Sequence, residues 1–126
     1  DGDVTGVMSV GIREIKNDIY FGVGGGPEGV LAAAALKCMD CQMQTRLVFQ
    51  NDQEEERAKS LGIKDLNKKY NIEDMVKGDV VFCATGVTSG DLAKGVKDLG
   101  NEYEVNTFVL HKSKNIIKSV TNIYNK

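Results

Sequence analysis

Residues 19 to 29, with the sequence IYFGVGGGPEG, limit the fold of this chain more than any other segment. The β-branched and aromatic residues at its start are typical of a strand. Three consecutive glycines followed by Pro27 are typical of a loop that opens a helix, because proline fits the first helical position. Backbone N–H groups at such a helix start attract anions. The segment therefore predicts a strand, a glycine loop and a helix, with an anion site at the loop.

Glu28 makes this loop unusual. A carboxylate in the first helical turn suits the helix dipole, but it would compete with a phosphate for the same positive end. A divalent cation between the two would remove the conflict, and Mg²⁺ and Mn²⁺ prefer hard oxygen ligands such as carboxylates. The loop is therefore interpreted as a site for a phosphate together with a metal. The simpler alternative is that Glu28 is a surface acid that only complements the dipole.

The remaining pattern alternates strands with helices. Apolar residues at helical spacing predict a helix over residues 4–16 with Asp3 as its cap. Further strands are expected at 19–23, 45–50 and 79–84, and further helices at 27–39, 51–61, 71–77 and 91–99. This alternation is typical of an α/β fold with a largely parallel sheet and flanking helices, in which ligands bind at the carboxyl ends of the strands.

The C-terminal segment has a different pattern. Residues 105–111 and 116–124 are strand-like and are separated by the turn residues 113–115, which predicts an antiparallel hairpin at the sheet edge. His111 lies within the first of these strands and is interpreted as a strand histidine without a catalytic role. Residues 85–91, TGVTSGD, are either a second phosphate cradle or a support loop in which Thr88 and Asp91 form a capping box. The support reading is favoured.

Composition excludes several classes of protein. The 126 residues suit one globular domain over residues 1–126, and a net charge of −2 with mixed signs gives no support for nucleic-acid binding. The longest apolar stretch, residues 30–36, is far shorter than the roughly 20 residues that span a bilayer. Three cysteines suit a reducing cytoplasm. Cys38 and Cys41 form a C-x-x-C at the end of a helix rather than at its start, so they are interpreted as structural.

A dinucleotide-binding fold is the strongest alternative from the residues alone. Residues 24–29 satisfy G-x-G-x-x-G after a strand and before a helix, and Asp52 follows the next strand, where a ribose-binding acid belongs. Two residues weigh against it. Pro27 removes an N–H donor, and Glu28 places negative charge where a pyrophosphate would lie. At this level both readings stay open.

Three blocks together point to a known family. The chain opens on DGDV, continues with GVGGGPEG, and carries FCATGVTSGDL at residues 82–92. In this order they resemble the class II, GlpX-type fructose-1,6-bisphosphatases. The resemblance covers nearly the whole chain, whereas family members are considerably longer, so it implies the C-terminal part of such an enzyme. A chain without an initiator Met that begins inside a motif fits that expectation.

The resemblance implies a fold, a reaction and a set of site residues. The fold would be of the sugar-phosphatase type, similar to inositol monophosphatase and fructose-bisphosphatase. The reaction would be hydrolysis of the 1-phosphate of fructose 1,6-bisphosphate to fructose 6-phosphate in gluconeogenesis, with Mn²⁺ or Mg²⁺, in the cytoplasm, by a homo-oligomeric full-length enzyme. The residues carried over as substrate contacts are Asp1, Gly2, Asp3 and Gly25, and Glu28 is carried over as a metal ligand. No catalytic residue is expected in this chain, and a catalytically silent binding or assembly module is a further alternative.

Overall fold

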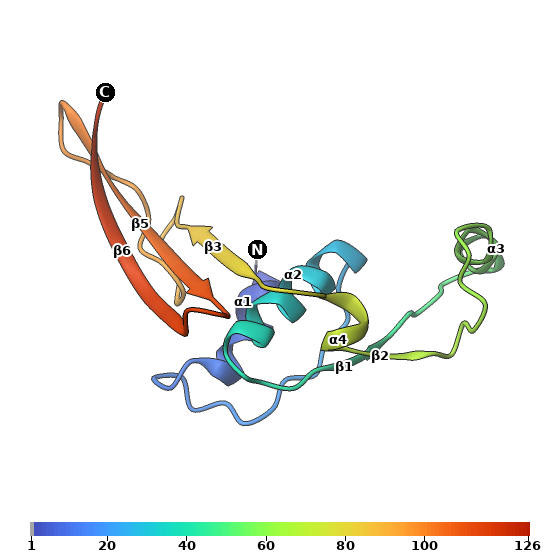
Figure 1. The fold of residues 1–126 in the computed structure, drawn as a ribbon. Helices are drawn as coiled ribbons and strands as arrows, with labels where there is room; N and C mark the ends of the chain where they lie inside the picture. The colour runs from blue at the N-terminus through green and yellow to red at the C-terminus, as the bar shows by residue number, and fades with distance from the viewer. Residues whose placement is uncertain (1) are drawn as a thin grey trace.

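The computed structural model describes residues 2–126 and has a mixed α/β fold (Figure 1). Its helical elements are α1 (Gly2–Met8), η1 (Ser9–Gly11), α2 (Gly26–Cys38), α3 (Asp52–Ser60) and α4 (Ile72–Met75). Its strands are β1 (Gln44–Arg46), β2 (Lys69–Asn71), β3 (Val81–Thr85), β4 (Lys97–Asp98), β5 (Glu102–His111) and β6 (Ile116–Asn125). No helix among the described residues is both long and apolar enough to cross a bilayer.

The sheets are antiparallel, so the expected parallel sheet is wrong. β1 pairs with β2 in a two-stranded ribbon, and β5 pairs with β3, β4 and β6 in a second sheet. A parallel pair needs a crossover, usually a helix that packs back on the sheet. α3 does not supply one, because it lies apart from the rest of the chain (Figure 1). The chain therefore returns from β1 into an antiparallel partner.

The strand expected at residues 19–23 is absent from the described structure. These residues adopt no regular secondary structure, and the side chain of Phe21 is 85% exposed. Tyr20 instead fixes the segment against α1. A Cβ atom on Gly6 would lie 2.9 Å from the Tyr20 ring, and one on Gly22 would lie 2.7 Å from it. The aromatic ring thus fills the space beside two glycines, and the backbone has no strand beside it to pair with.

The helix expected at residues 91–99 is also absent. Residues 86–94 form a closed loop, which Asn106 of β5 holds through two hydrogen bonds, and residues 97–98 form the short strand β4. The Gly86 N–H donates to the Asn106 carbonyl at 3.0 Å, and the Lys94 N–H donates to Asn106 Oδ1 at 3.0 Å. The capping box proposed for Thr88 and Asp91 is wrong, because no helix follows it.

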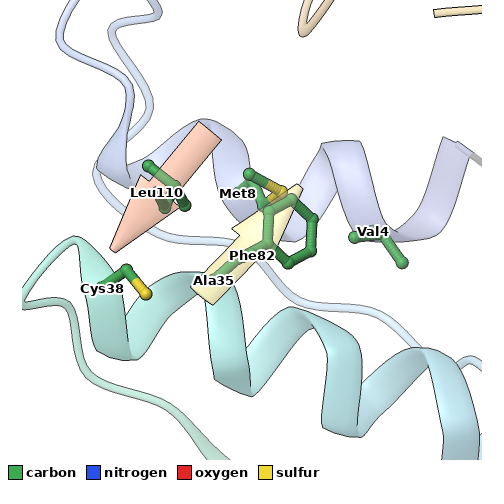
Figure 2. Close-up of a cluster of buried hydrophobic side chains, with 6 residues drawn as sticks. All are labelled: Val4, Met8, Ala35, Cys38, Phe82 and Leu110. Carbon is green, nitrogen blue, oxygen red and sulfur yellow. The ribbon is translucent and has the colours of Figure 1, made fainter. Parts of the chain in front are cut away.

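The core lies between the first two helices and one face of the larger sheet. Figure 2 shows the packed cluster, which α1, α2, β3 and β5 build together from Val4, Met8, Ala35, Cys38, Phe82 and Leu110. Small alanines on α2 allow it to approach both α1 and the sheet closely. A second cluster of Ala33, Leu36 and Ile72 joins α2 to α4. α2 is therefore the central element of the core, and the glycine loop lies at its N-terminal end.

Several local expectations are confirmed. β5 and β6 form the antiparallel hairpin expected at the C-terminus. The Glu54 N–H donates to Asn51 Oδ1 at 3.0 Å, which gives α3 its expected cap. Gly62, just after that helix, has a φ of +89°, a conformation that favours glycine. The helix expected at 4–16 is shorter, because regular α-helix ends at Met8.

Candidate functional site

The glycine loop ends where helix α2 begins. Gly25 is the N-cap residue with φ −66° and ψ 154°, and no side chain caps the helix there. Pro27 lies in the first turn, as expected, and Glu28 is the acidic residue of that turn. The Gly29 N–H already donates to the Gly25 carbonyl at 3.0 Å. The helix start therefore presents backbone donors and one carboxylate on the same turn.

Two close approaches join the sequence blocks around this loop. A Cβ atom on Gly25 would collide with Glu28 Oε2, so the carboxylate folds back over the glycine backbone. A Cβ atom on Gly24 would lie 3.3 Å from Asp3 Oδ2. Glycine is needed where a side chain would occupy the space that a carboxylate fills. The loop thus brings Asp3 of the DGD motif next to Gly24 and Glu28 next to Gly25, so the two carboxylates approach adjacent residues.

A cavity of about 600 Å³ opens at this loop. Asp3, Gly25 and Glu28 line it, so the structure brings these three predicted site residues together. Gly2 opens helix α1. Asp1 lies outside the described residues. Asp3 lies inside the first turn of α1 rather than at its cap position, so the expected capping role is wrong.

The cavity also contains residues that sequence reasoning missed. Arg46 on β1 and Tyr70 on β2 are among the residues that line it. Thr45 and Tyr70 are directly opposite each other in the β1–β2 ribbon, which places this ribbon as a wall of the cavity. A guanidinium is well suited to binding phosphate through paired hydrogen bonds. The presence of Arg46 in an expected strand was a visible signal, but its spacing from the glycine loop gave no reason to select it.

The carboxylates of the cavity do not form a complete metal centre. The residues that the structure describes include no group of three or more His, Cys, Asp or Glu side chains that could hold a metal ion. The available donors are of the right type, because carboxylate oxygens are the ligands that Mg²⁺ and Mn²⁺ prefer. They are too few for the usual oxygen coordination of either ion.

Residues 85–91 lie at a different cavity. This space of about 690 Å³ is lined by the loop together with Thr5, Gly6 and Ser9 of the first helical segment. The loop is internally bonded: the Gly90 N–H donates to the Ala93 carbonyl at 3.0 Å, and the Gly95 N–H donates to Ser89 Oγ at 3.0 Å. The first of these bonds uses a backbone donor of the loop that a phosphate cradle would need, and the second uses a side-chain hydroxyl of the loop. They support the structural interpretation of the loop.

The cysteines lack the features of a redox pair. Cys38 is buried at the end of α2, and its thiol donates to the Val80 carbonyl at 3.6 Å. Burial raises the pKa of the Cys38 thiol and of the half-buried Cys41 thiol, so both stay protonated at neutral pH. The structural interpretation of the C-x-x-C fits these surroundings.

His111 belongs to a polar cluster at the end of the β5–β6 hairpin. Its Nε2 atom lies 2.8 Å from Asp79 Oδ2 and 3.1 Å from Ser113 Oγ. The Ser113 hydroxyl donates to Asp79 Oδ2 at 2.6 Å, and the Ser113 N–H donates to Asp79 Oδ1 at 2.9 Å. These hydrogen bonds, led by the Ser113 hydroxyl, hold the pKa of the Asp79 carboxyl well below its usual range. His111 is a partnered strand residue, as expected.

Comparison with known proteins gives matches over nearly the whole chain. The sequence profile of a family described as "Bacterial fructose-1,6-bisphosphatase, glpX-encoded" matches residues 1–124. A "Fructose-1,6-bisphosphatase class 2" from Haemophilus influenzae is 36% identical over 138 residues, which cover 98% of this chain and 41% of the relative. A "D-fructose 1,6-bisphosphatase class 2/sedoheptulose 1,7-bisphosphatase" from a Synechococcus species is 31% identical and covers 100% of this chain and 40% of its own.

A relative with the same double name from Gloeobacter violaceus is 30% identical, over 98% of this chain and 40% of its own length. The chain therefore spans about 40% of the length of the curated relatives it matches. The family match includes the DGD block, the glycine loop and the loop of residues 85–91. The chain belongs to the glpX-encoded, class II family of bacterial fructose-1,6-bisphosphatases.

Proposed function

We propose that this chain forms the substrate-side wall of a metal-dependent phosphatase that hydrolyses the 1-phosphate of fructose 1,6-bisphosphate. The observation that carries the proposal is the cavity in which Asp3, the glycine loop and Glu28 meet. Its chemistry suits a phosphorylated sugar with a cation, because it combines a helix start with two carboxylates and has Arg46 among its lining residues. The product, fructose 6-phosphate, and a place in cytoplasmic gluconeogenesis follow from the resemblance.

Each residue of the cavity has a distinct proposed role. Glu28, together with carboxylates from the rest of the full-length enzyme, would hold Mn²⁺ or Mg²⁺, which neutralises charge that develops on the phosphoryl group. Gly25 lets the backbone approach the ligand closely. Asp3 would accept hydrogen bonds from sugar hydroxyls, and we propose that Asp1 and Gly2 also contact the substrate. Arg46, which is also among the lining residues, would contribute positive charge near the bound phosphate.

The dinucleotide alternative has little support in the fold. Asp52, its proposed ribose-binding acid, begins α3 and is not among the residues that line the cavity. The half-buried Glu28 carboxylate lies over Gly25, where a pyrophosphate would have to bind. A negative ligand at that position would meet a negative side chain unless a cation separated them. The geometry therefore favours a phosphate with a metal.

The test uses a hybrid enzyme, in which this chain is joined to the unmatched part of the Haemophilus influenzae relative. Glu28→Gln keeps the size of the side chain but removes its charge. We expect it to raise the Mn²⁺ concentration needed for half activity and to lower turnover by about two orders of magnitude, the scale of losing one electrostatic stabiliser. Phosphate release from fructose 1,6-bisphosphate and from sedoheptulose 1,7-bisphosphate is measured against Mn²⁺ concentration.

Asp52→Asn is the matched control, because it removes a carboxylate from a helix start outside the cavity. It should leave activity and metal dependence within about twofold, since its surroundings give it only a surface role. Near-normal activity with unchanged Mn²⁺ dependence in Glu28→Gln would show that this glutamate is merely a helix-end charge.

A further inference from the structure

The larger sheet has one face that helices cover in part, where Ile117 of β6 is still 56% exposed, and one face that no helix of the described chain covers (Figure 1). Side chains alternate between the faces along a strand, and directly opposite residues share a face. Phe82 and Leu110 are opposite each other and both lie in the core cluster. Their sequence neighbours must therefore point the other way. Figure 1 shows α1 and α2 to one side of the β5–β6 hairpin and no helix on the other side.

Apolar side chains outnumber polar ones on the bare face, which also carries His111, Lys118 and Asn122. We call it the outer sheet face and define it by Val81, Cys83, Tyr103, Val109, Val120 and Tyr124. Val81 is 59% exposed and Tyr124 is 54% exposed. Neither core cluster of the described residues contains a side chain of this face. An antiparallel sheet that has one face in water usually presents polar residues there.

Register places several of these apolar residues side by side, although Lys118 is directly opposite Val109. Cys83 is directly opposite Val109, and Tyr103 is directly opposite Tyr124. Val120 is opposite Thr107, which in turn is opposite Thr85 of β3. The face thus carries aliphatic side chains near the helices and a pair of tyrosines toward the far end of the hairpin. Contiguous apolar surface on a folded protein marks an interaction site.

The relatives supply an occupant for this face. They match this chain over 98 to 100% of its length, whereas the match covers only 40 to 41% of theirs. More than half of each relative therefore lies outside the matched region. We propose that in the family enzyme this remaining part docks on the outer sheet face and buries it. The chemistry required of the docking segment is an apolar face, since the surface offers mainly aliphatic and aromatic contacts.

Cys83 provides a built-in probe of this docking. It is the exposed cysteine of the three, whereas Cys38 is buried and Cys41 is half-buried. A thiol-alkylating reagent should modify Cys83 rapidly in the 126-residue chain. In the hybrid enzyme we expect Cys83 to be modified at least about tenfold more slowly, because a segment docked on the face limits access to the thiol. Peptide-resolved mass spectrometry measures the rate. Equal rates in the two proteins would overturn the proposal.

A second copy of this chain is the competing occupant. Size-exclusion chromatography with light scattering measures the mass of the 126-residue chain across concentrations. We expect Cys83 to stay reactive at every concentration. A dimer of the 126-residue chain in which Cys83 becomes protected would assign the face to self-association and overturn the proposal.

A pair of substitutions locates the docking on this face. Val81→Lys places a charge on the outer sheet face, and Leu61→Lys places one at the end of α3, where a cation suits the helix dipole. Both should be nearly neutral in the 126-residue chain, because both side chains are exposed. In the hybrid enzyme we expect Val81→Lys to lower the melting temperature by about 5 °C or more and Leu61→Lys to leave it nearly unchanged. Equal effects would contradict docking at this face.

The native Haemophilus influenzae relative gives a measurement that needs no hybrid. Hydroxyl-radical footprinting compares its side chains at the positions matched to β3, β5 and β6 in the full-length relative and in its excised matched region. We expect the outer-face positions to be modified at least about tenfold less in the full-length protein. Equal modification would overturn the proposal. None of these measurements uses phosphatase activity, so their failure is distinct from failure of the proposed function.

Discussion

At the scale of single residues, Gly25 and Glu28 act as one unit. The φ and ψ angles of Gly25 lie in the extended region that any residue can adopt, so its backbone does not require glycine. What requires glycine is space, because a Cβ atom there would collide with the Glu28 carboxylate. The position of that carboxylate therefore depends on the absence of a neighbouring side chain. A substitution can separate this effect from stability.

We expect Gly25→Ala to lower the free energy of unfolding by no more than about 1 kcal/mol, since alanine is a poorer N-cap residue than glycine but the colliding group is the end of a flexible side chain. The displaced carboxylate should reduce Mn²⁺-dependent activity of the hybrid enzyme by about tenfold or more. Denaturant unfolding and phosphate release are measured in parallel. Gly29→Ala is the control, because a Cβ atom at Gly29 meets nothing within 4 Å.

The control should behave differently in both measurements. Gly29 lies inside helix α2, where alanine stabilises a helix by roughly 0.5 to 1 kcal/mol relative to glycine. It should keep its activity. Equal activity loss in the two variants would mean that the loop responds to any added methyl group and that the position of Glu28 is not the cause.

At the scale of elements, the start of β3 is tied to the β5–β6 hairpin by the Asp79, His111 and Ser113 cluster. The pKa of Asp79 is lowered in the folded chain, first by the Ser113 hydroxyl and then by His111. A lowered folded pKa stabilises the fold above the unfolded value of about 3.9, and this stabilisation is lost as pH falls below it. The cluster should therefore weaken in acid.

Asp79→Asn tests this expectation. The variant should be less stable than the parent chain at neutral pH, and the difference in melting temperature should shrink as pH falls from about 5 toward 2.5. Melting is followed by circular dichroism at matched ionic strength. Asp65→Asn is a suitable control, because Asp65 Oδ1 accepts only a local turn hydrogen bond from Asn67 N–H at 2.9 Å. A pH-independent difference for Asp79→Asn would contradict the assignment.

Helix α3 gives a second prediction at this scale. It has nine residues and one buried side chain, Ala58, and it lies apart from the core (Figure 1). An isolated helix of this length is marginal in water even with good caps. Its last-turn amides should exchange with deuterium at least about tenfold faster than those in the buried middle of α2. Equal protection would show that α3 packs against a surface in solution.

Local signals in the sequence were enough for some elements and not for others. The cap at Asn51, the glycine at residue 62 and the turn after His111 act within a few residues, and the structure confirms all three. Strand order depends on distant partners. Residues 19–23 carry a strand pattern but have no neighbouring strand to pair with. Asn106 holds residues 86–94 in a loop through hydrogen bonds that no local sequence pattern indicates.

The same distinction holds for the site. Asp3, Gly25 and Glu28 were selected from motifs, and the structure brings them to one cavity. Arg46 was missed because it reaches the cavity through the pairing of β1 with β2, which the sequence does not specify. The sequence motifs therefore identified the glycine-loop residues that line the cavity. The contribution of the β1–β2 ribbon became visible only in the fold.

At the scale of the whole molecule, the cavity is open and its ligands are few. Asp3, Glu28 and Arg46 are among its lining residues, whereas the described residues contain no group of three or more potential metal ligands. Phosphoryl transfer needs metal ions held by several oxygen ligands and a positioned nucleophile. The chain alone therefore has part of the chemistry that the family name implies.

We accordingly expect the 126-residue chain alone to release no phosphate from fructose 1,6-bisphosphate above the background rate, with either Mn²⁺ or Mg²⁺. The hybrid enzyme, assayed under the same conditions, should be active, because the added part supplies further oxygen ligands. A mixture of the chain with the separately purified unmatched part tests whether the two associate into the same site. Clear metal-dependent turnover by the chain alone would show that Glu28 and its neighbours are sufficient for metal binding and catalysis. It would also place the reacting phosphate wholly within the cavity that Asp3, Gly25 and Arg46 line.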